Sequence, residues 1–124
     1  MEKTNNTEFK RRMIDRTWKF STATAKLVEN ISGGAAVRVI ANQLAKSAMS
    51  VGANYRSCCK GKSTADFAAK ITIVEKEADE SAYWLEMLVE LGKISVVEAD
   101  PLIKEAYEFA AICGSAAYNS KKRV

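Results

Sequence analysis

The residues best suited to chemistry are six carboxylates on one predicted helix, between positions 75 and 90. Carboxylates at such spacing can act as general acid and base or hold a divalent cation. The 124-residue chain has no histidine, which removes the commonest metal ligand and the commonest general base near neutral pH. No other predicted helix carries a matching motif, so we expect no enzyme, no metal and no cofactor. The carboxylates are Glu75, Glu77, Asp79, Glu80, Glu86 and Glu90.

Cysteine is the other reactive residue type, and two of the three cysteines, Cys58 and Cys59, are adjacent. Neighbouring side chains on a helix point about 100° apart, and this spacing does not match a zinc site. We favour buried, reduced thiols over redox chemistry for this pair and for Cys113.

The sequence shows no targeting or membrane segment. No signal-peptide pattern follows Met1, and no apolar stretch approaches the ~20 residues that span a bilayer. We therefore expect a cytoplasmic protein.

Apolar residues recur along the chain at alternating gaps of three and four, which is the spacing of a buried helical face. The pattern is clearest from Phe67 to Leu88, where it resembles the seam of a coiled coil. Glycines interrupt the pattern at 33–34, 61 and 92, where helices can end. We predict four helices, near residues 7–31, 35–60, 64–91 and 100–120.

Two local motifs indicate where the later helices begin. Ser63 is expected to cap the third helix, with Asp66 three residues further on. Asp100-Pro101 predicts the start of the fourth helix, and Ser95 with Glu98 suggests a short turn before it. Short connections make consecutive helices antiparallel. We thus predict an all-α, up-down-up-down four-helix bundle, a single domain over residues 1–124.

This topology brings distant basic segments to one end of the bundle. Residues 1–16, 56–70 and 121–124 carry twelve basic and four acidic residues, a net charge of +8 against −4 for the remainder. Such an end can neutralise phosphates, although no motif that reads bases is present. The alternative is a solubilising surface. We favour nucleic-acid contact, through Lys10, Arg11, Arg12, Arg16, Arg56, Lys60, Lys62, Lys121, Lys122 and Arg123.

The third predicted helix has a second stripe beside its seam that mixes large apolar residues with carboxylates. A helix of a four-helix bundle normally buries one face, and Trp and Met are enriched where subunits meet. The stripe therefore suggests an oligomer interface; the alternative is that Trp84 caps the bundle core. The expected interface residues are Trp18, Ile73, Trp84, Met87 and Leu91.

Several residues around the second helix suggest structural roles. Lys46 is expected opposite Glu77 and Glu80, in ion pairs that set the helix register. Gly52 inside a helix costs ~1 kcal/mol relative to alanine, so it indicates a close helix approach. Asn54 and Arg56 could bind RNA or anchor the following turn. We favour an anchor for Asn54, beside Tyr55.

The second and third predicted helices, about half of the chain, resemble a known family. These are the bacterial four-helix-bundle proteins encoded in 23S rRNA intervening sequences, often labelled S23 ribosomal proteins. The turn Cys58-Cys59-Lys60-Gly61 departs from the family's alanine- and arginine-rich turn. The resemblance lies in Gln43-Leu44, in Ser50-Val51-Gly52-Ala53-Asn54-Tyr55-Arg56, in Ser63, Asp66-Phe67 and Lys70, and in Glu75-Lys76-Glu77-Ala78-Asp79-Glu80-Ser81-Ala82-Tyr83-Trp84-Leu85-Glu86.

The resemblance implies a ring-like homopentamer without an established enzymatic activity. The resemblance also implies a link to a relative that accompanies the reverse transcriptase of diversity-generating retroelements. That relative is a basic, nucleic-acid-binding barrel. Taken with the charge pattern, the resemblance predicts a non-catalytic homo-oligomer that binds RNA or a ribonucleoprotein such as the ribosome through its basic end. The alternative is a structural or adaptor protein that binds a protein partner and no nucleic acid.

Overall fold

Four α-helices account for most of the chain. The structure is a computed structural model that describes the backbone of residues 2–123 and the side chains of residues 6–122. The helices are α1 (Glu2–Glu29), α2 (Ala35–Cys58), α3 (Thr64–Glu90) and α4 (Val96–Arg123), and residues 2–123 contain no strand. The predicted all-α fold is confirmed.

The caps of α3 form where the sequence predicts them. The Ser63 hydroxyl oxygen accepts a hydrogen bond from the Asp66 backbone N–H at 3.1 Å, which satisfies one of the unpaired donors at the helix start. At the other end, Gly92 has a φ of 71°, and the Lys93 N–H donates to the Leu88 carbonyl at 2.9 Å. This is a Schellman motif, in which glycine takes the left-handed conformation that ends a helix.

The start of α4 differs from the prediction. Ser95 and Glu98 form a capping box: the Glu98 N–H donates to the Ser95 hydroxyl at 3.0 Å, and the Ser95 N–H donates to the Glu98 carboxylate at 3.2 Å. The helix therefore begins at Val96, and Pro101 lies inside it. The prediction of a separate turn before a helix starting near residue 100 was wrong, because the capping box is the stronger start signal.

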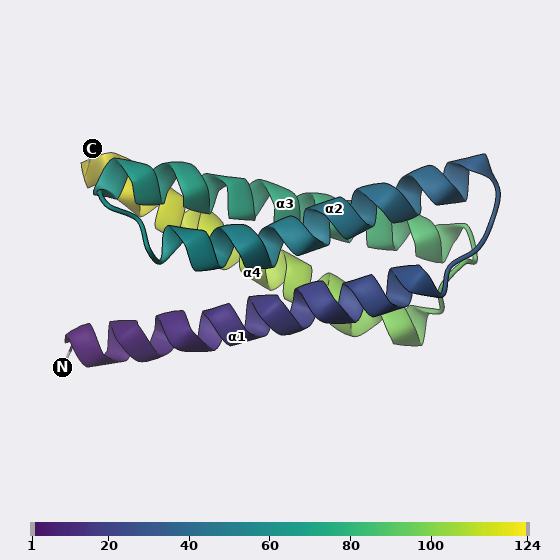
Figure 1. Cartoon of the computed structure of the whole chain (residues 1–124), viewed down its shortest axis with the longest axis horizontal. Coiled ribbons are helices and arrows are strands. Elements are labelled where there is room, and N and C mark those ends of the chain that lie inside the picture. The colour runs from purple at the N-terminus through teal and green to yellow at the C-terminus, as the bar shows by residue number, and fades with distance from the viewer. Residues whose placement is uncertain (1, 124) are drawn as a thin grey trace.

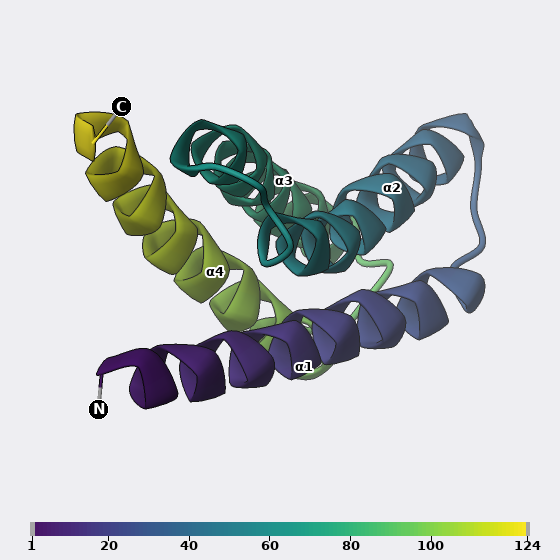
Figure 2. The same ribbon diagram turned by 60° about the vertical axis from the view of Figure 1, so that its left-hand side comes forward.

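Consecutive helices run antiparallel, so both chain ends and the α2–α3 turn lie at one end of the molecule (Figure 1). Each helix packs along the next one in the chain, whereas α1 and α4 contact each other over only a short stretch. Figure 2 shows these two helices crossing at an angle and separating toward the two termini. The backbones of the N-terminal part of α1 and the C-terminal part of α4 thus diverge.

The core follows the predicted helical seams. The rings of Phe20 on α1 and Phe109 on α4 pack edge to face, with centroids 5.5 Å apart and planes at 85°. Burying such a ring stabilises the fold by about 2–3 kcal/mol. Along α2, the residues at alternating gaps of three and four are all buried: Val37, Ala41, Leu44, Ala48, Val51, Tyr55 and Cys58.

Candidate nucleic-acid interface and the adjoining groove

The structure brings the three predicted basic segments to one end of the bundle (Figure 1). They are the N-terminal half of α1, the C-terminal end of α2 with the α2–α3 turn, and the C-terminal end of α4. We call this the basic end. Its described cations fall into two groups, those that are paired with a carboxylate and those that have a weak carboxylate partner or none.

Arg16 belongs to the group that is paired with carboxylates. Its guanidinium group hydrogen-bonds the carboxylate of Glu105 on α4, and lies 3.0 Å from that of Glu108. It also lies 5.1 Å from the centre of the Phe109 ring. The hydrogen bond that Arg16 donates to Glu105 raises the pKa of Arg16 further, so its charge is fixed in this arrangement. Arg16 therefore ties α1 to α4, and we leave it out of the interface proposed below.

The other predicted cations are more available to bind phosphates. Among the described side chains, no carboxylate lies within ion-pair distance of Arg56, Lys60, Lys62 or Lys121, all of which are exposed. Arg11 and Arg12 each approach Glu8 only at 3.9 Å, in exposed pairs that are worth little. The remaining members are Lys10, which is half-buried, Lys122, which lies 4.5 Å from the Tyr118 ring, and Arg123, whose side chain is outside the described residues.

A groove of about 710 Å³ runs between α1 and α2 and reaches the basic end. The two helices come close at Gly52, where an added Cβ would lie 2.6 Å from the Ser21 hydroxyl and 3.2 Å from the Thr17 carbonyl oxygen. The Ser21 hydroxyl donates to the Ala48 carbonyl at 2.6 Å, across the same contact. The close approach predicted from Gly52 is confirmed, and it forms the floor of the groove.

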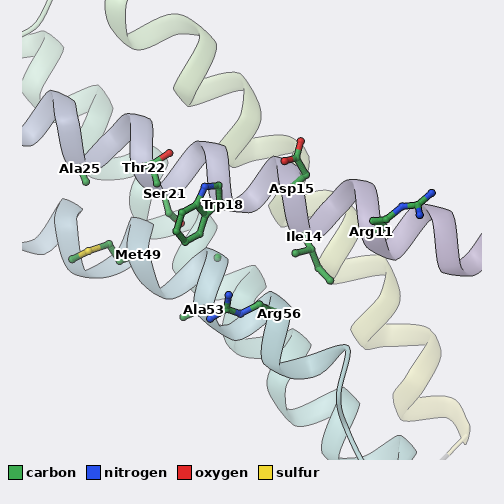
Figure 3. A pocket seen from close by; sticks show the side chains of 11 residues that line it. Arg11, Ile14, Asp15, Trp18, Ser21, Thr22, Ala25, Met49, Ala53 and Arg56 are labelled. Atoms are coloured by element: carbon green, nitrogen blue, oxygen red, sulfur yellow. The ribbon is translucent and has the colours of Figure 1, made fainter.

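The lining of this groove is mainly apolar, with two arginines toward the basic end. Figure 3 shows Trp18 and Ile14 directed from α1 toward α2, with Met49, Ala53 and Arg56 on the facing stretch of α2. Trp18 is 59% exposed and Met49 50% exposed. The remaining lining residues are Arg11, Asp15, Ser21, Thr22, Ala25 and Gly52.

The five predicted interface residues do not form one patch. Trp18 lies in the α1–α2 groove, whereas the other four are on α3, whose backbone does not approach that of α1 closely in the described chain. Ile73 and Leu91 are exposed, at 42% and 47%. Trp84 and Met87 are half-buried against the core. The α3 stripe is therefore an apolar strip with two partly buried members.

The register of α2 and α3 is held differently from the prediction. Among the described side chains, no ion pair joins Lys46 to Glu77 or Glu80. Burial and then the Glu80 charge raise the pKa of Glu77, and the charges of Lys76 and Lys46 offset only part of this rise. The direct link is a buried contact in which the Ser81 hydroxyl lies 3.0 Å from the Ser47 hydroxyl. Ser81 lies in the predicted seam, but the sequence offered no signal that Ser47 would face it.

Asn54 does not anchor the α2–α3 turn. Its amide donates to the Ser50 carbonyl at 3.0 Å and to the Ser50 hydroxyl at 2.7 Å, one turn earlier in the same helix. The prediction was wrong because a short amide side chain inside a helix reaches back to the preceding turn more easily than forward. Tyr55 is buried, which fits a structural role.

The three cysteines are free thiols with different surroundings. Cys58 and Cys113 are buried, and Cys59 is half-buried. Burial raises the pKa of Cys113 to about 12. Hydrogen bonds from Cys58 and Tyr55, with the charge of Lys10, outweigh burial and lower the pKa of Cys59 to about 7. Two thiols are therefore inert packing groups, and the third is partly ionised near neutral pH.

The part of the chain that the structure describes holds neither a metal-binding cluster nor a helix suited to crossing a membrane. No three Cys, Asp or Glu side chains there gather closely enough to hold a metal ion. None of the described helices combines the length and apolarity that crossing a membrane requires.

Comparisons with known proteins agree with this architecture. A crystal structure of a protein of unknown function from the S23 ribosomal protein family of Bacteroides thetaiotaomicron VPI-5482 superposes with a TM-score of 0.76. The two chains are 28% identical, and the match covers 85% of this chain and 97% of the other. No protein with a curated function matches the sequence. Residues 10–115 match the model of the 23S rRNA-intervening sequence proteins, so the chain belongs to this family.

Proposed function

We propose that this chain is a non-catalytic, homo-oligomeric helical bundle that binds RNA through its basic end. The observation that carries the proposal is the gathering of cations from three separate segments at one end, where all the predicted members with described side chains except Arg16 have at most a weak, exposed carboxylate partner. Each cation that replaces a counterion on a phosphate contributes affinity that does not depend on sequence. The three free cysteines fit a reducing compartment, so we place this function in the cytoplasm.

The experiment is a salt titration of RNA binding, followed by fluorescence anisotropy of a labelled oligonucleotide. We expect the logarithm of the association constant to fall linearly and steeply with the logarithm of salt concentration. The variant Arg12→Glu/Lys60→Glu/Lys62→Glu should weaken binding by about tenfold or more and flatten the slope.

A matched control keeps the same change in net charge. Lys26→Glu/Lys76→Glu/Lys93→Glu reverses three exposed cations away from the basic end. It should change the affinity by less than about threefold, since its sites are beyond the Debye length of the bound RNA at physiological salt. Equal losses in both variants would show that total charge, and not the basic end, determines binding.

The homo-oligomer is supported by the apolar strip on α3. Large apolar side chains that stay exposed beside a packed core are typical of subunit interfaces. The family resemblance implies a ring-like pentamer. We therefore expect light scattering to give a mass several times 13.6 kDa, and Ile73→Glu/Leu91→Glu to reduce it. Val39→Glu/Val97→Glu, at two exposed positions off this strip, is the control.

The competing function is an adaptor that binds a protein partner and uses its charge only for solubility. The observation in its favour is the apolar lining of the α1–α2 groove. It predicts RNA binding no stronger than that of an unrelated protein with a formal net charge of +4. The same anisotropy titration separates the two functions.

A further inference from the structure

We propose that the groove between α1 and α2 binds single-stranded RNA, with one base stacked on Trp18 and the flanking phosphates on Arg11 and Arg56. The proposal deepens the proposed function and rests on it, because it assumes that RNA binds at the basic end. It adds that the recognised RNA is single-stranded and that Trp18 distinguishes a single strand from a duplex.

Trp18 is the residue that gives the groove a stacking surface. Its side chain is 59% exposed, whereas the other tryptophan, Trp84, packs against the core and against the Tyr83 ring, with centroids 4.9 Å apart. An exposed indole beside cationic side chains is the arrangement by which proteins bind single strands without reading sequence, since every base has a flat π-face.

The charges around Trp18 match a phosphodiester. No carboxylate lies within ion-pair distance of Arg56 among the described side chains, and Arg11 has only the exposed Glu8 at 3.9 Å. Asp15 is the one acid among the lining residues, and Lys19 neutralises it at 2.9 Å. The basic-end opening of the groove therefore carries two exposed guanidinium groups that can pair with phosphates of a bound strand.

The shape of the groove favours a single strand over a duplex. Its volume of about 710 Å³ lies within the ~300–1,000 Å³ range of small-molecule sites, which suits a few nucleotide units. The close contact at Gly52 closes the floor, and Ile14, Ala53 and Met49 supply apolar walls. A duplex keeps the flat faces of its bases stacked inside the helix, so it can use the arginines but cannot stack a base on Trp18.

The test observes Trp18 directly. In the Trp84→Phe variant, Trp18 is the single tryptophan of the chain, since the sequence has two. We expect a mixed-sequence single-stranded RNA 12-mer to quench its fluorescence with saturation, at the concentration where anisotropy reports binding. The matching duplex should bind with little quenching. If Trp84→Phe does not fold, the difference between the wild type and Trp18→Phe gives the same signal.

A second measurement compares affinities. Trp18→Ala should weaken single-strand binding by about tenfold, leave duplex binding within about twofold, and be partly rescued in Trp18→Phe, whose ring can still stack. Met49→Ala, which removes a groove side chain with similar exposure but no ring, is the control. It should change single-strand affinity far less than Trp18→Ala.

Three outcomes would overturn the proposal. RNA binding without quenching, and unchanged in Trp18→Ala, would refute the groove site and leave the proposed function standing. No binding of either RNA form would refute the proposed function and this inference together. The third outcome is that, without RNA, the Trp18 emission shifts with protein concentration and Trp18→Ala forms a smaller oligomer. This result would show that a second copy of the chain occupies the groove.

Discussion

The guanidinium group of Arg16 lies 3.0 Å from the carboxylate of Glu108, and this ion pair joins α1 to α4. Glu105, one turn earlier on α4, binds the same guanidinium group. The same two helices also meet through the edge-to-face contact of Phe20 with Phe109, so Arg16 adds a polar link beside an aromatic one.

Replacing Arg16 should therefore destabilise the protein. In Arg16→Met, the apolar stem remains while Glu105 and Glu108 lose their shared partner. We expect the free energy of unfolding to fall by about 1–2 kcal/mol in urea denaturation, a value held down by the partial exposure of the groups. Lys19→Met is the control, because it removes an exposed i,i+4 pair with Asp15 that is worth about 0.5 kcal/mol or less. Equal losses would contradict the special role of Arg16.

Adding a methyl group at Gly52 should also destabilise the protein, although alanine is the better helix former by ~1 kcal/mol. The new Cβ would lie 3.2 Å from the Thr17 carbonyl oxygen, which belongs to the backbone of the facing helix and cannot rotate away. We expect Gly52→Ala to lower the thermal midpoint measured by circular dichroism.

Gly114 provides the matched control for Gly52. It also lies inside a helix, but its added Cβ would meet the Glu75 carboxylate at 2.8 Å, the far end of a flexible side chain. Gly114→Ala should thus be neutral or stabilising. The Ser21→Ala/Gly52→Ala pair should recover part of the loss, because it removes the hydroxyl 2.6 Å from the new Cβ. If the double variant recovers none of the lost stability, the strain comes from the Thr17 carbonyl oxygen alone.

The helices and their buried faces were predictable because both depend on local signals. The seam of α2 from Val37 to Cys58 follows the 3.6-residue period, and the Ser63 cap depends on residues three apart. The crossing of α1 with α4 depends on how whole surfaces interdigitate, which apolar period alone does not encode. Arg16 was therefore predicted as a free cation, since Glu105 lies 89 positions away along the chain.

The same distinction applies to the candidate site. The basic end follows from topology and composition, so its location was predictable. The α1–α2 groove was not, because it depends on the side-by-side placement of Trp18 and Met49 on two helices. Gly52 was the available signal, because a glycine within a helix indicates a close approach to a neighbouring helix. It did not indicate on which side of that contact a groove would form.

Cys59 should be the first thiol to react with iodoacetamide. Because its pKa is lowered to about 7, the reactive thiolate persists down to neutral pH, and the alkylation rate should reach half its maximum near pH 7 instead of near 8.5. The same lowering stabilises the folded state above the pKa of the unfolded thiol, a contribution lost as the pH falls through 7. Mass spectrometry of the digested protein identifies the modified residue.

Lys10 provides the internal test of that assignment. Its charge lowers the pKa of Cys59, so Lys10→Met should move the alkylation midpoint to higher pH. Cys113, whose pKa burial raises to about 12, should stay unmodified at neutral pH in the folded protein. Modification of Cys113 before Cys59 would contradict the predicted order.

Thr24 carries a buried hydroxyl group with no hydrogen-bond partner in the described structure, and its replacement by valine should stabilise the protein. An unsatisfied buried hydroxyl costs about 1–3 kcal/mol, and valine keeps the β-branched shape with nearly the same helix propensity. We expect Thr24→Val to raise the free energy of unfolding by about 1 kcal/mol in urea. Thr17→Val is the control, because the equally buried Thr17 hydroxyl donates to the Ile14 carbonyl at 3.2 Å and its loss should give no gain. A gain of the same size in both variants would show that added apolar surface, and not the missing partner, is responsible.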